Sequence, residues 1–117
     1  MGINEELGLP FGDGMEKFIV AFDVDGTLIG GGINEEHWDI VDMAKTFSTF
    51  KNVKVVVWSG GGKDYAATIG YRLGLDNFVW KYMSKLQYKE LSGHKIIAID
   101  DVQDTRLGDV NLIVRNK

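Results

Sequence analysis

Short apolar runs alternate with helical patterns along this chain, and no other feature constrains its fold as strongly. The runs lie at Lys17–Phe22, Val53–Trp58, Phe78–Trp80, Lys95–Ile99 and Leu112–Val114. Nearly continuous apolar runs are typical of strands buried on both faces, as in a parallel sheet that is covered by helices. With right-handed crossovers, this alternation predicts an α/β fold, namely a three-layer Rossmann-like sandwich around a mostly parallel central sheet of about five strands.

Helix signals fill the segments between these runs. The first predicted helix spans residues 34–50, begins at a capping Asn34 and carries one apolar stripe, which consists of Trp38, Val41, Ala44 and Phe47. A second helix is predicted over residues 63–73, before Gly74. Ser84 is placed to cap a third helix that ends at Leu91.

The composition excludes several classes of function. A net charge of −4 gives no electrostatic basis for binding nucleic acid, and the absence of cysteine excludes disulfides and a thiolate nucleophile. No apolar run is long enough to span a bilayer, and we expect no secretory signal and no membrane partner. The sequence thus predicts a soluble, cytoplasmic protein, and it is compatible with a homo-oligomer.

The carboxyl ends of the predicted strands are all polar. They carry Asp23-Val24-Asp25, Ser59-Gly60-Gly61, Lys81 and Asp100-Asp101. In an open α/β sheet these ends meet at one edge, which is where ligands bind. Asp23 and Asp25 are expected on the same side of an extended strand, about 6.6 Å apart, where their repulsion favours a raised pKa or a bound cation. We therefore predict a Mg²⁺ site formed by Asp23, Asp25, Asp100 and Asp101.

The same edge holds the groups that phosphoryl transfer requires. One carboxylate can attack phosphorus to give an aspartyl-phosphate, and a second can protonate the leaving oxygen and later accept a proton from water. A hydroxyl, backbone amides and a lysine can stabilise the charge on the phosphoryl oxygens. The candidates for that role are Ser59, the amides near Gly60, and Lys81 or Lys85.

Three segments resemble, in the family's order, motifs of the haloacid dehalogenase (HAD) superfamily. The run Phe22–Leu28 is similar to its first motif, Val55–Gly60 to its second and Ile96–Asp101 to its fourth. The resemblance covers roughly residues 17–115 and implies a phosphatase-type hydrolase. It divides the chain into a flexible leader, residues 1–16, and a single HAD-like catalytic domain, residues 17–117.

The resemblance also implies a role for each matched residue. Asp23 is the expected nucleophile, Asp25 the general acid and base, and Ser59 a phosphoryl ligand. Asp101, followed by Asp100, is expected to complete the coordination of Mg²⁺. The full phosphate-binding set implied is Asp23, Val24, Asp25, Ser59, Gly60, Lys81 and Lys85.

The third motif of the family is a lysine that is often followed by proline, and the match there is incomplete. Lys85 fits the start of a helix and Lys81 the end of a strand, and neither precedes a proline. We favour Lys85 as the catalytic lysine.

Members of the family often carry an inserted cap domain that selects the substrate. Here Leu28–Gly32 is a short turn, and the 18 residues between Ser59 and Phe78 leave space for one helix. No cap domain is therefore expected. Such an open site suits phosphorylated small molecules or bulky phosphorylated macromolecules, or a site that a partner subunit covers.

Two other functions stay open. A receiver-like phosphoacceptor module also combines acids, a hydroxyl and a lysine around Mg²⁺, although receivers carry the acidic pair early in the chain. A catalytically silent binding domain on the same fold is the other alternative. Both histidines, His37 and His94, are predicted to be structural.

Overall fold

The structure is a computed structural model that describes residues 16–30, 35–104 and 106–115. Of the predicted leader, only Glu16 is among these residues, and Asn34 also lies outside them. The first helix begins at Trp38 with His37 at its N-cap position, so the predicted helix start at residue 34 is wrong.

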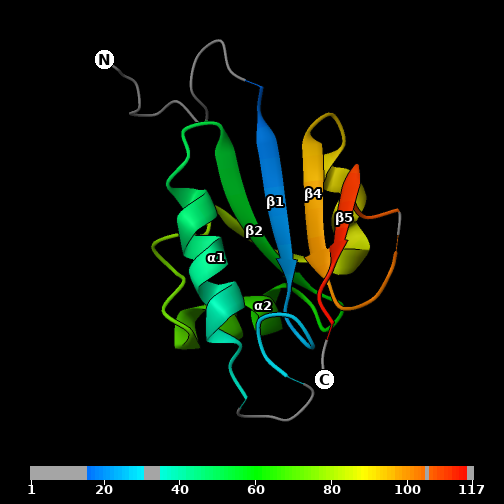
Figure 1. Ribbon diagram of the computed structural model, residues 1–117. Helices are drawn as coiled ribbons and strands as arrows, with labels where there is room; N and C mark the ends of the chain where they lie inside the picture. Colours follow the sequence, from blue (N-terminus) through cyan, green and yellow to red (C-terminus); the bar gives the residue numbers. More distant parts are fainter. Residues whose placement is uncertain (1–15, 31–34, 105, 116–117) are drawn as a thin grey trace.

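Five strands form one parallel sheet in the described part of the chain (Figure 1). Their bounds are Phe18–Asp23 for β1, Val53–Ser59 for β2, Lys81–Ser84 for β3, Lys95–Asp100 for β4 and Val110–Ile113 for β5. They are arranged in the order β3-β2-β1-β4-β5, with β1 at the centre. The predicted α/β fold and the five-stranded parallel sheet are confirmed.

Strand β1 is buried on both faces, as its apolar sequence predicts. Val20 and Phe22 point into one core cluster, whereas Ile19 and Ala21 point into the other, and all four side chains are fully buried. Alternating side chains of a strand face opposite sides of the sheet. Because the residues of β1 before Asp23 are all apolar, both faces of this strand have to be covered by other elements.

Helices on both faces provide that cover and complete the three layers (Figure 1). On one face lie α1 (Trp38–Ser48) and α2 (Lys63–Arg72), which contribute Val41, Ala44 and Ile69 to the first cluster. On the other face, the 3-10 helix η1 (Lys85–Leu91) buries Leu91. The hydroxyl of Ser84 caps η1 by accepting a hydrogen bond from the amide of Leu86, as the sequence predicts.

One prediction about α1 is wrong. Trp38 is 54% exposed and is not part of the core, whereas Ile40, Val41 and Ala44 are buried. Residues three apart drift by about 60° per step around a helix with 3.6 residues per turn. A stripe built only from such steps spirals away from the core, so its first residue, Trp38, faces solvent.

The third strand also begins later than predicted. Residues Phe78–Trp80 precede the strand, and β3 starts at Lys81. The amides of Phe78 and Val79 donate to the carbonyl of Leu75, and the amide of Trp80 donates to the carbonyl of Val55. Lys81 therefore begins a strand instead of following one. This shift decides which lysine can reach the carboxyl edge of the sheet.

The connections leave no place for a cap domain in the described residues. Between β2 and β3 there is a single helix, α2, and the described part of the β1–α1 connection is a compact turn in which Ile29 bridges to both Asp25 and Glu36. None of the described helices has the length and apolar character required to cross a membrane.

We predict that Phe22→Ala lowers the free energy of unfolding by about 3–5 kcal/mol, because it opens a cavity in the fully buried centre of the sheet. Urea unfolding measures this change. Tyr71→Ala on the exposed side of α2 is the control and should cost less than about 1 kcal/mol. Equal losses in both variants would contradict the packing described here.

Candidate active site

The order of the strands reverses between β1 and β4. From β1 the chain moves outward to β2 and β3, and it then returns to the other side of β1 to form β4 and β5. Ligands of open α/β sheets bind beyond the carboxyl ends of the strands at such a reversal. The two strands end here in Asp23 and in Asp100, which Asp101 follows.

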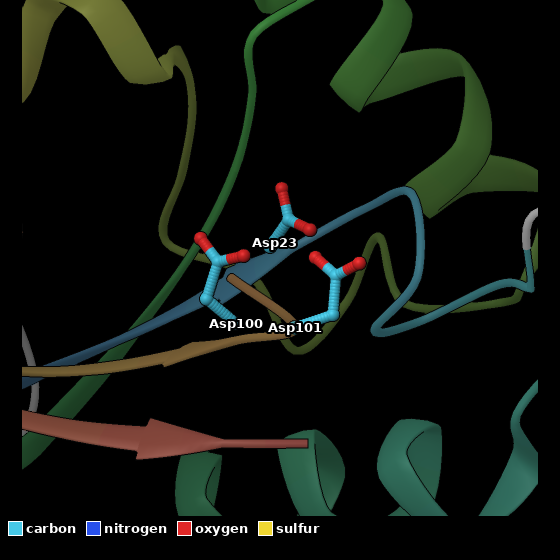
Figure 2. A group of neighbouring side chains, drawn as sticks. All are labelled: Asp23, Asp100 and Asp101. Atoms are coloured by element: carbon cyan, nitrogen blue, oxygen red, sulfur yellow. The ribbon is translucent and has the colours of Figure 1, made fainter. Parts of the chain in front are cut away.

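Three carboxylates meet at this point (Figure 2). Asp23, Asp100 and Asp101 each offer an oxygen, and these oxygens lie within 4.8 Å of one another. Asp23 is only 5% exposed and Asp100 only 4%, whereas Asp101 is half-buried. The predicted convergence of the first and last acidic motifs is therefore present in the structure.

Lys85 lies between two of the acids. Its Nζ is 2.6 Å from Oδ1 of Asp23 and 2.8 Å from Oδ2 of Asp100. The lysine is the first residue of η1, so the capped start of that helix fixes its backbone beside the sheet edge.

Lys81 does not reach this group of acids. It pairs with Val56 at the start of β3, three residues before the Ser84–Ser59 pair and so about 10 Å back along the sheet. Its Nζ lies 5.9 Å from the centre of the exposed Trp80 ring. Of the two candidate lysines, only Lys85 contacts the acidic cluster.

Burial has a large effect on the protonation of these groups. It raises the pKa of Asp23 to about 7, against the opposing influence of Lys85 and with a further contribution from the charges of Asp100 and Asp101. Burial likewise raises the pKa of Asp101. Burial lowers the pKa of Lys85, but its bonds to Asp100 and Asp23 outweigh this effect, and the pKa lies above its ordinary value. The lysine stays charged, and the neighbouring carboxylates carry an excess of negative charge.

The next strand end contributes Ser59. It is the last residue of β2, is buried, and accepts a hydrogen bond of 2.9 Å from the amide of Gly61. Gly60 beside it is exposed. Val24, which is also in the predicted phosphate-binding set, buries its side chain in the core, so only its backbone is available for a phosphate.

Asp25 takes a different position from the one predicted. Strand β1 ends at Asp23, and the chain turns through Val24, whose carbonyl accepts from the amides of Thr27 and Leu28. Side chains two apart share a face only while the backbone stays extended. The Asp25 carboxylate is therefore not part of the acidic cluster, but is exposed and accepts a hydrogen bond of 2.7 Å from the hydroxyl of Tyr65.

Three further residues contribute to this site: Thr27 and Gly26 lie within the motif-like run Phe22–Leu28, whereas Tyr65 was not predicted from the sequence. Thr27 is fully buried and its hydroxyl lies 3.3 Å from Oδ2 of Asp23, to which it donates. Gly26 has a φ of +85°, and the Asp101 carboxylate occupies the place that a Cβ would take. Tyr65 lies 40 residues from its partner Asp25, so no local pattern could have identified it. His37 contacts the carbonyl of Thr27 at 2.9 Å through Nδ1, which agrees with a structural role.

Comparisons of this chain with family models, with curated proteins and with solved structures give no match. The resemblance to the HAD superfamily thus depends on the sequence motifs alone.

We predict that without metal the free energy of unfolding falls as the pH rises from about 4 to about 7, by at most about 1.4 kcal/mol per pH unit for one group. Asp23 binds a proton more tightly when folded, so its contribution is full below the usual aspartate pKa of about 4. This stabilising contribution is lost as the pH rises past about 7, which is the pKa of Asp23 in the folded protein. Urea unfolding in a chelator at pH 5 and pH 8 measures the difference. The decrease in unfolding free energy between pH 5 and pH 8 should be smaller in Asp23→Asn. It should be unchanged in Asp42→Asn, which alters an exposed residue of α1.

Proposed function

We propose that this protein is a Mg²⁺-dependent phosphatase of the HAD type, which hydrolyses phosphate monoesters through an aspartyl-phosphate on Asp23. The observation that carries the proposal is the position of Asp23 at the reversal of the strand order. There it contacts Lys85 and shares a cluster with Asp100 and Asp101. Burying a carboxylate among further acids costs stability, and such strongly perturbed groups are concentrated at functional sites.

The donor atoms suit magnesium. Asp23, Asp100 and Asp101 are oxygen ligands from three positions around one point, and Mg²⁺ prefers carboxylate oxygens together with those of a phosphate. Among the described residues, Lys85 is the cation that pairs with these acids, and the three carboxylates leave a net negative charge that a divalent ion would neutralise. When bound, Mg²⁺ would offset the charge of the carboxylates and of the phosphoryl oxygens, so that one anion can approach the other.

In the first step, an oxygen of the Asp23 carboxylate bonds to phosphorus while the bond between phosphorus and the ester oxygen breaks. Asp25 donates a proton to the departing oxygen, which leaves as an alcohol. Lys85 and the hydroxyl of Ser59 hydrogen-bond to the phosphoryl oxygens. The exposure of Asp25 supports its role, because a proton donor to the leaving group has to face the incoming substrate.

In the second step, Asp25, now a carboxylate, accepts a proton from water. The water oxygen bonds to phosphorus, the bond between phosphorus and Asp23 breaks, and inorganic phosphate leaves. Thr27 supports Asp23 in both steps, because its buried hydroxyl donates to the second carboxylate oxygen and restricts rotation of the group.

The site lacks a covering domain in the described residues, which suits a broad range of phosphorylated substrates, from small molecules to macromolecules. We also propose a cytoplasmic location, in keeping with the absence of cysteine. The strand order β3-β2-β1-β4-β5 gives no support to the receiver alternative, because receivers have the flavodoxin-like order 2-1-3-4-5.

We predict that the wild type hydrolyses p-nitrophenyl phosphate only with Mg²⁺, and that Asp23→Asn lowers kcat at least about 1,000-fold, because the amide is not a nucleophile. Phosphate release measures turnover. Asp42→Asn is the matched control, since it changes the same side chain at an exposed position of α1.

Activity that survives in Asp23→Asn would remove the nucleophile assignment. Lasting phosphorylation by acetyl phosphate without turnover would instead favour a receiver-like module. A wild type that neither turns over nor becomes phosphorylated would favour a silent binding domain.

We predict that Mg²⁺ raises the melting temperature. At a concentration 100-fold above Kd, binding to the folded state alone adds about 2.7 kcal/mol, or roughly 10 °C for a domain of this size. Asp101→Asn should reduce the shift because it removes a ligand. Gly26→Ala should do the same, since its Cβ would displace the Asp101 carboxylate.

Differential scanning fluorimetry with and without a chelator measures these shifts. Asp42→Asn is again the control and should respond to Mg²⁺ like the wild type. If millimolar Mg²⁺ leaves the melting temperature of the wild type unchanged, the assignment of the metal would be contradicted.

A further inference from the structure

One side chain from outside the recognisable motifs contacts the proposed acid and base. Tyr65 lies in the first turn of α2, and its hydroxyl donates a hydrogen bond of 2.7 Å to Oδ1 of Asp25. Asp25 is exposed on the turn that follows β1, where an unrestrained carboxylate would sample several rotamers. The bond joins the two segments that border the site, namely that turn and the start of α2.

The position of the tyrosine is itself fixed by packing. Its ring is half-buried against the first core cluster, and the neighbouring residue Ala66 is fully buried in that cluster. The ring also lies close to Gly61, because a Cβ at that position would come within 3.1 Å of Cδ2 of Tyr65. The absence of a side chain at Gly61 thus leaves room for the ring beside the strand end that carries Ser59.

We propose that Tyr65 is a positioning residue of the phosphatase, which holds the carboxyl group of Asp25 so that Oδ2 faces the leaving oxygen. This inference rests on the proposed function and adds to it a residue that none of the motifs contains. With Oδ1 engaged by the tyrosine hydroxyl, the proton to be transferred is carried by Oδ2.

The role concerns one proton transfer. As the bond between phosphorus and the ester oxygen breaks, the electron pair stays on that oxygen, and the proton moves to it from Oδ2 of Asp25. The alcohol departs, Asp25 is left as a carboxylate, and the phosphoryl group is bonded to Asp23. The hydroxyl of Tyr65 keeps its own proton throughout, so it acts only through Asp25.

The importance of this transfer depends on the leaving group. A p-nitrophenolate ion leaves readily without a proton, whereas an alkoxide does not. A residue that orients the proton donor should therefore matter for alkyl phosphates and hardly at all for p-nitrophenyl phosphate. A residue that only holds α2 in place would affect both substrates alike.

The test compares kcat/KM for p-nitrophenyl phosphate and for a series of aryl and alkyl phosphates of rising leaving-group pKa. We expect Tyr65→Phe to lower kcat/KM by about tenfold or more for alkyl phosphates and by less than about twofold for p-nitrophenyl phosphate. Phenylalanine keeps the ring that packs beside Gly61, and Tyr71→Phe, on the exposed side of the same helix, is the matched control. The melting temperature of each variant verifies that it is folded.

A double-mutant cycle supplies a second readout. If Tyr65 acts through Asp25, Tyr65→Phe should cause no further loss for alkyl phosphates in an Asp25→Asn background. Losses that multiply would mean that the tyrosine acts independently of Asp25 and would overturn the inference.

Failure of this inference differs from failure of the proposed function. A wild type without Mg²⁺-dependent activity, or an Asp23→Asn variant that retains it, would refute the phosphatase itself. A wild type that hydrolyses the whole series, with a Tyr65→Phe variant that loses activity equally on all substrates or on none, would refute only the positioning role.

Discussion

The burial of the Asp23 carboxylate at the end of the central strand is the constraint on which the rest of the structure depends. The residues of β1 before Asp23 are apolar, so both faces of the strand have to be covered. This requirement places β1 at the centre of the sheet. The residue that ends it is then removed from water, where an isolated charge is costly. Lys85 at 2.6 Å and the Thr27 hydroxyl at 3.3 Å offset part of that cost, and both are held by short local structures, a capped 3-10 helix and a tight turn.

The site is not electrostatically balanced by its own residues. Three carboxylates gather within 4.8 Å, and one ammonium group lies between two of them. Proteins tolerate such local conflicts mainly where they serve a function, and the stability lost there is supplied by the surrounding core. In this chain the two apolar clusters on either side of the sheet supply that stability. The raised pKa of Asp23 reflects its burial and the charges of the neighbouring acids. A bound cation and a phosphate would each use this arrangement, the first by neutralising the acids and the second by contacting Lys85.

The groups of the site differ in how firmly the fold holds them. Asp23, Ser59 and Asp100 are the last residues of buried parallel strands, so their positions follow from the hydrogen bonding of the sheet. Asp25 lies instead on an exposed turn, and its carboxylate is restrained by a tyrosine from another segment. This division suits the proposed reaction, in which the nucleophile stays fixed while the proton donor faces substrates of different shapes and is oriented from outside the sheet.

The sequence by itself determined the strands apart from β3, their parallel arrangement and the convergence of Asp23 with Asp100 and Asp101, because burial on both faces produces apolar runs whose carboxyl ends share one edge. It also determined the capped start of η1, because capping is a local interaction between Ser84 and an amide two residues ahead. Only the tertiary structure decided that Lys85 and not Lys81 contacts the acids, since this depended on where β3 begins. It likewise decided that Asp25 bonds to Tyr65 and is not part of the acidic cluster, and that Trp38 faces solvent. Periodicity and capping are encoded within a few neighbouring residues, whereas the contact of two side chains 40 residues apart depends on how whole elements pack against one another.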